Sequence, residues 1–134
     1  MIGVVIVSHG NIAKEFLSVA ENILGKQEKL VTICMDIGDD IEKRREEIMM
    51  GVRSVDSGSG VVILTDMFGG APSNLAISVL DGGMKEVLAG LNLPMLIKLL
   101  SVRKMLPFAG AVEQARDAGH KYLGTSSAIL GKAS

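Results

Sequence analysis

The chain is organised around two stretches, IGVVIVSHG at residues 2–10 and VVILTDMFGGAPSN at residues 61–74. Each begins with an uninterrupted apolar run rich in Val and Ile, which is typical of a strand buried on both faces of a parallel sheet. Each then reaches a polar residue and a glycine-containing turn where the strand should end. Because ligands bind at the carboxyl ends of strands in open α/β sheets, we expect the functional residues there.

The rest of the chain continues this pattern. Further apolar runs occur at residues 30–35 and 86–89, and the segments between the runs have helical periodicity. We therefore predict an α/β fold with a mainly parallel four-stranded sheet and helices on both faces. Right-handed crossovers favour the strand order 2-1-3-4. The length predicts a single domain over residues 1–134, with a C-terminal tail from about residue 120.

Capping residues predict where the helices begin. Asn11 is the expected N-cap of the first helix, and Pro72 suits the first position of the third. In the second helix, Asp39 and Glu42 have capping-box spacing. The residues expected to be buried by this second helix are Ile41, Ile48, Met49 and Val52.

Composition excludes some classes of function. Charged residues make up 22% of the chain and the net charge is only −1, which argues against a nucleic-acid partner. The single cysteine, Cys34, cannot form an internal disulfide and is expected to be a buried structural thiol. The apolar runs are shorter than a membrane span and no basic leader precedes them. We expect a cytoplasmic protein without an anchor of its own.

The predicted strand order brings His9 and Asp66 together. Both residues lie at the carboxyl ends of strands, and the chain reverses direction between these two strands. A lone histidine is often structural, and Asp66 alternatively caps the helix that follows it. Their predicted meeting at one crevice favours a functional role for both.

The pair suits phosphoryl transfer. A neutral imidazole attacks phosphorus through one ring nitrogen when the proton resides on the other, and a carboxylate that accepts this N–H fixes the tautomer. Backbone amides at helix starts favour bound anions. The candidate phosphate-binding residues, by backbone amide or side chain, are Ser8, Gly10, Gly69, Gly70, Ala71, Ser73 and Asn74. Without a Walker loop or a clustered ligand set, we expect neither a metal nor another cofactor.

These motifs resemble the mannose-type enzyme IIA (EIIA) family of the bacterial phosphoenolpyruvate-dependent sugar phosphotransferase system (PTS). The resemblance rests on SHG at residues 8–10, DMFGGAPSN at 66–74 and GLNLPML at 90–96, in that order. It implies that His9 accepts a phosphoryl group and that Asp66 orients this histidine. Many members carry Ser or Thr where this chain has Ala71, so Ser73 or backbone amides would replace that hydroxyl.

The resemblance also implies the partners of such a phosphotransferase. The phosphoryl group would come from phospho-HPr and pass to an EIIB protein, which we expect to be a separate chain because no EIIB domain follows in this sequence. The family further implies a homodimer with protein-docking surfaces around the histidine. Contact with the membrane would be indirect, through a permease complex.

Other functions remain open at this point. The main alternative is a regulatory PTS protein whose His9 phosphorylation state is read by a partner, without sugar transport. A histidine phosphatase or phosphoglycerate mutase also carries a histidine after its first strand, but Ser8 replaces the arginine of its RHG motif. A phosphoryl-donor subunit of a dihydroxyacetone kinase is a further relative, although the GGAPSN loop at residues 69–74 fits the mannose type better.

Overall fold

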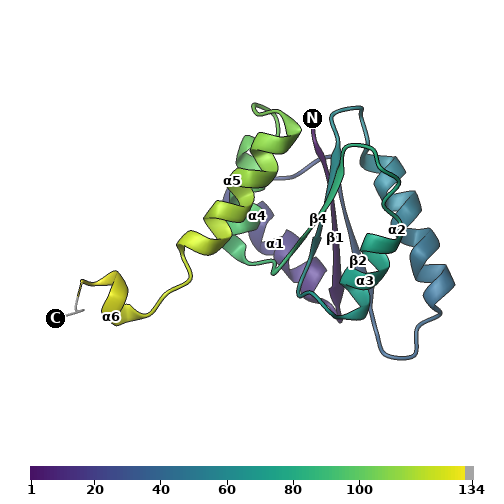
Figure 1. Cartoon of the computed structure of the whole chain (residues 1–134), viewed down its shortest axis with the longest axis horizontal. Coiled ribbons are helices and arrows are strands. Elements are labelled where there is room, and N and C mark those ends of the chain that lie inside the picture. Colours follow the sequence, from purple (N-terminus) through teal and green to yellow (C-terminus); the bar gives the residue numbers. More distant parts are fainter. Residues whose placement is uncertain (132–134) are drawn as a thin grey trace.

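The computed structural model describes residues 1–131. Strands and helices alternate along the chain up to the fourth strand, and three helices follow that strand (Figure 1). In chain order the elements are β1 (Gly3–His9), α1 (Ile12–Leu24), β2 (Leu30–Met35), α2 (Ile41–Val55), β3 (Val61–Thr65), α3 (Ala71–Ser78), β4 (Lys85–Ala89), α4 (Leu93–Val102), α5 (Phe108–Lys121) and α6 (Ser126–Ile129).

The four strands form one parallel sheet in the order β2-β1-β3-β4. The predicted α/β class and strand order are therefore confirmed. In this register Val7 lies opposite Thr65, so His9 and Asp66 follow at the same edge of adjacent strands. The chain reverses its winding direction between β1 and β3, which places both residues at the predicted switch point.

Helices cover both faces of the sheet (Figure 1). Alternate residues of each strand pack against different helices. Val4, Ile6 and Leu64 belong to the core on the side of α1, α4 and α5. Val5 and Ile63 belong to the core on the side of α2 and α3. Because both faces are apolar, the central strands read in the sequence as continuous hydrophobic runs.

Two helix starts differ from the sequence-based expectation. Asp40, rather than Asp39, caps α2, because its Oδ1 accepts hydrogen bonds from the amides of Glu42 and Lys43. The α3 helix begins one residue before Pro72, which is its second residue. Both differences place the helix within one residue of the expected start, as is common for helix ends.

A buried arginine ties the elements together at the amino edge of the sheet, opposite His9. Arg103 follows α4 and is 2% exposed. Its Nη1 donates to the carbonyl oxygens of Ile2, at 3.2 Å, and Lys29, at 3.1 Å. Its Nη2 donates to Gln27 Oε1 at 3.0 Å. These bonds satisfy carbonyls that precede β1 and β2, so Arg103 fixes the edge from which both strands start.

The C-terminal segment leaves the body of the fold after α5. Figure 1 shows α6 standing away from the sheet and its covering helices. The α5 helix continues through the start of the expected tail, to Lys121. Within the described residues, none of the helices is long and apolar enough to cross a membrane.

Candidate active site

His9 and Asp66 meet at the carboxyl edge of the sheet. The Oδ2 atom of Asp66 lies 2.8 Å from His9 Nδ1 and also accepts the backbone N–H of His9 at 2.9 Å. Its Oδ1 accepts the N–H of Met67 at 3.1 Å. The His9 side chain is 47% exposed and that of Asp66 is 13% exposed. The carboxylate is thus fixed from the protein side, while the imidazole reaches the surface.

The local electrostatics keep Asp66 ionised. Its partial burial acts to raise the pKa, but the hydrogen bonds from the His9 amide and imidazole outweigh burial, and the net pKa of Asp66 is lowered. An ionised carboxylate accepts hydrogen bonds and donates none. His9 Nδ1 therefore carries the hydrogen in this contact, and in a neutral ring Nε2 keeps its lone pair.

The backbone of Gly70 lies against the outer edge of the imidazole. A methyl group on Gly70 would be 2.6 Å from His9 Cε1 and 3.1 Å from Nε2. Gly70 is also the N-cap residue of α3. The free ring nitrogen therefore lies beside the start of this helix, where backbone amides and the helix dipole favour an anion. Because Gly70 occupies the cap position, Asp66 does not cap α3.

Two candidate phosphate-binding residues already make other hydrogen bonds. The buried hydroxyl of Ser8 accepts the N–H of Ala13 at 2.8 Å and so performs the capping expected of Asn11, whose side chain makes no cap bond. The Gly10 amide donates to Met35 O at 2.7 Å. These two residues join β1 to α1 and β2, and their hydrogen bonds support the turn that carries His9.

The remaining candidates lie in the turn before α3 and in its first residues. Gly69 adopts a φ of +83°, which favours glycine, and Ala71 is the first residue of the helix. Ser73 is buried, and its hydroxyl donates to Gly70 O at 3.2 Å, whereas Asn74 is exposed. The first N–H groups of a helix have no partner within it, so this end offers donors close to His9 Nε2.

The loop between β2 and α2 also borders His9. A hollow of about 620 Å³ lies between His9 and this loop. Its lining residues are His9, Gly10, Met35, Asp36, Ile37, Gly38, Asp39, Ile41, Ala71 and Pro72. The histidine is therefore reached across an open, largely apolar depression, which suits contact with another macromolecule.

Sequence reasoning missed the exposed apolar side chains around the site. Met67 and Phe68 are more than half exposed in the turn after Asp66, and Ile37 is fully exposed in the β2–α2 loop. Their positions in the sequence could have indicated this exposure, because large apolar residues in a turn directly after a strand end are not needed for the core. The second histidine, His120, lies at the end of α5 and lines a different hollow with Phe68 and Arg116.

Metal ligands do not cluster at this site. Within residues 1–131, the structure contains no group of three His, Cys, Asp or Glu side chains placed to hold a metal ion. The sole cysteine, Cys34, is partly buried in β2. Fold and site together define an α/β protein that presents a carboxylate-oriented histidine at the carboxyl edge of its sheet.

Comparison with known proteins gives a consistent result. A model of the EIIA-man family, described as the PTS system fructose IIA component, matches residues 3–116. The PTS system mannose-specific EIIAB component of Escherichia coli K12 is 37% identical over 122 residues, which cover 87% of this chain and 38% of that protein. The PTS system fructose-specific EIIA component of Bacillus subtilis 168 is 30% identical over 107 residues, covering 79% and 73%.

A solved structure agrees along nearly the whole chain. The phosphotransferase system component EIIA from Streptococcus agalactiae aligns with a TM-score of 0.84 and 32% sequence identity, covering 96% of this chain and 99% of that one. The chain belongs to the EIIA-man family of the PTS. It spans 38% of the length of the E. coli relative.

Proposed function

We propose that His9 accepts a phosphoryl group from phospho-HPr and passes it to an EIIB protein in sugar uptake. The observation that carries this proposal is the 2.8 Å contact of His9 Nδ1 with Asp66, which leaves Nε2 unpaired and close to the surface. Residues 1 to about 120 form the EIIA unit in this proposal, and the residues that follow form a tail.

In the proposed reaction, Nε2 is the nucleophile. Its lone pair forms a bond to phosphorus while the P–N bond to the donor's histidine breaks, and the bonding pair returns to the donor nitrogen. The His9 ring becomes cationic, with its proton still on Nδ1 and still donated to Asp66. The Asp66 carboxylate stabilises the cationic ring more than it stabilises the neutral ring, so the contact lowers the free-energy barrier to phosphoryl transfer. Transfer to EIIB reverses these steps with a new acceptor.

The phosphoryl oxygens would bind at the start of α3. We assign the cradle to the backbone amides of Gly69, Gly70, Ala71 and Ser73, supplemented by the exposed side chain of Asn74. Ser8 and Gly10 are left out of the cradle because their hydrogen bonds hold α1 and β2. With alanine at position 71, the proposed cradle depends on amides and the helix dipole rather than on a hydroxyl.

A homodimer is part of the proposal. The family resemblance implies it, and α1 carries exposed apolar residues that a second copy would cover, among them Val19 and Ile23. Val19 also lines a hollow of about 460 Å³, together with Ile12, Phe16 and Leu93. Sedimentation equilibrium tests this part, since a monomer at micromolar concentration would contradict it.

The first experiment follows the phosphoryl group. The protein is incubated with phosphoenolpyruvate, enzyme I and HPr, and acid-labile phosphate is mapped by mass spectrometry in wild type and His9→Ala. We expect label on His9 that is absent from the variant, and unchanged labelling of His9→Ala would exclude this function. Onward transfer to a purified EIIB protein distinguishes a carrier from the regulatory alternative, in which phosphorylated His9 is only read by a partner.

A further inference from the structure

The loop between β2 and α2 forms a closed turn with one apolar side chain at its tip. The N–H of Asp39 donates to Asp36 O at 3.2 Å, and the N–H of Asp36 donates to Asp39 Oδ2 at 2.8 Å. Gly38 adopts a φ of +90°, a conformation that other residues rarely adopt. Between these residues, Ile37 is fully exposed.

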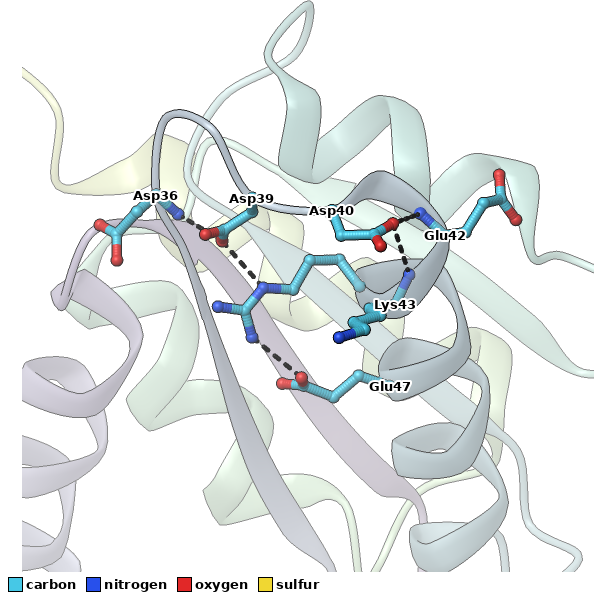
Figure 2. A network of polar contacts seen from close by, with 7 residues as sticks. Asp36, Asp39, Asp40, Glu42, Lys43 and Glu47 are labelled. Carbon is cyan, nitrogen blue, oxygen red and sulfur yellow. Dashed lines mark hydrogen bonds and ion pairs between the residues drawn. The ribbon is translucent and has the colours of Figure 1, made fainter.

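A network of charged side chains holds this turn in place (Figure 2). Arg44 Nε donates to Asp39 Oδ2 at 2.8 Å, and Arg44 Nη1 donates to Glu47 Oε2 at 2.9 Å. The hydrogen bond from the Asp36 amide, and then that from Arg44, lower the pKa of Asp39, so its carboxylate stays ionised. Asp40 caps α2 next to the turn. Such bonds order a loop before it meets a partner, which reduces the entropy cost of binding.

The position of the turn links it to the transfer site. Ile37 and Asp36 line the same hollow as His9 and Pro72. Ile41, at the first residue of α2, is 47% exposed and lies in the same lining. A protein that presents a group to His9 Nε2 across this hollow therefore meets the tip of the loop. An exposed isoleucine here contributes nothing to the core, so its burial by a partner would be favourable.

Charge indicates the chemistry of that partner. The lining of the hollow contains the carboxylates of Asp36 and Asp39 but no Lys or Arg. Asp39 is paired with Arg44, whereas the Asp36 carboxylate makes no hydrogen bond or ion pair within residues 1–131. Figure 2 shows the Asp36 carboxylate turned away from the network. A partner with a cationic side chain at this point would complement it.

The geometry points to a docking role for Asp36 and Ile37. The partner that binds at these two residues is the phosphoryl-donor protein. It presents an apolar hollow for Ile37 beside a Lys or Arg that pairs with Asp36. This assignment rests on the proposed function of His9, because it concerns the protein from which the phosphoryl group arrives. The loop tip sets recognition of the donor and takes no part in the chemical step.

The test measures initial rates of His9 phosphorylation over a range of phospho-HPr concentrations. Ile37→Ala should raise KM about tenfold with kcat unchanged, as expected for truncation of a central contact residue. Asp36→Lys should raise KM further at low salt than at high salt, since screening weakens the repulsion. Met105→Ala, an exposed residue after α4 at the other edge of the sheet, and Glu113→Gln, on α5, are the matched controls.

The outcomes separate this inference from the function on which it rests. Unchanged KM in both Ile37→Ala and Asp36→Lys, with normal labelling of wild type, would overturn the docking role alone. A fall in kcat at constant KM would also overturn it, because the loop would then act on the chemistry. Failure of wild type to accept label from phospho-HPr would refute the proposed function and this inference together.

Discussion

Replacing Gly70 with alanine should displace the His9 ring while leaving the fold intact. The added methyl group would lie 2.6 Å from His9 Cε1, closer than side-chain carbons approach one another. Gly70 has φ −90° and ψ 166°, which alanine adopts without strain, so the effect is one of contact rather than backbone conformation. Because the ring is 47% exposed, it can move outward, and this movement takes Nδ1 away from Asp66.

The size of the effect follows from the hydrogen bond that is lost. During transfer the ring is cationic, and a hydrogen bond between charged groups contributes about 1.5 to 3 kcal/mol. About 1.4 kcal/mol corresponds to a tenfold change in rate, so transfer should slow by about 10- to 150-fold. The His9 side chain is 47% exposed, so the loss of this contact in the unphosphorylated protein should change the free energy of unfolding by only about 1 kcal/mol.

The assay is single-turnover labelling with phospho-HPr, with circular dichroism to check the fold. Gly110→Ala is the matched control, because a methyl group at this position in α5 would be no closer than 4.0 Å to its neighbours. Adding Asp66→Asn to Gly70→Ala should slow transfer little further, since both changes remove the same contact. A wild-type rate in Gly70→Ala would refute the idea that this glycine positions the ring.

Three further changes test other parts of the structure. Ser8→Ala removes the acceptor of the Ala13 N–H and should lower the free energy of unfolding by about 1 to 2 kcal/mol in urea titrations, and no loss would contradict the capping role. The pKa of Asp66 is lower in the folded chain than in the unfolded chain, where it is about 3.9. The free energy that the ionised Asp66 contributes to folding is therefore present above the unfolded pKa and is lost as the pH falls through the folded pKa. The stability difference between wild type and Asp66→Asn should therefore shrink as pH falls from about 5 to below 4, and a constant difference would exclude this effect. Arg103→Met should cost about 1 to 3 kcal/mol in chemical denaturation because it leaves the buried carbonyl oxygen of Ile2 without its Arg103 donor. The carbonyl oxygen of Lys29 keeps the N–H of Val4, and the transfer rate of the folded fraction should stay normal because Arg103 lies at the opposite edge of the sheet.

The sequence predicted the sheet well because its strands are buried on both faces. The expected strands at residues 30–35 and 61–65 agree with the structure at both ends. Strand order then placed His9 beside Asp66, and the 2.8 Å contact confirms that they meet. This part of the site was predictable because topology alone determines it.

Details that depend on neighbours in space were not predictable. Asp39 and Asp40 are both suitable caps for α2, and Arg44 decides between them by pairing with Asp39. Ile41 has the right spacing for a buried helix face but lies 47% exposed beside the hollow next to His9. Likewise, the Gly10 amide bonds to a carbonyl of the neighbouring strand β2, a partner that its own sequence surroundings do not reveal.

Nuclear magnetic resonance of the phosphorylated protein would identify which atom carries the phosphoryl group. With ¹⁵N-labelled histidine, the ring nitrogen bonded to phosphorus is resolved from the one that keeps its hydrogen. Because Asp66 holds Nδ1, we expect Nε2-phosphohistidine at His9 with Nδ1 still protonated. Phosphate on Nδ1, or on a residue other than His9, would contradict the role assigned to this pair.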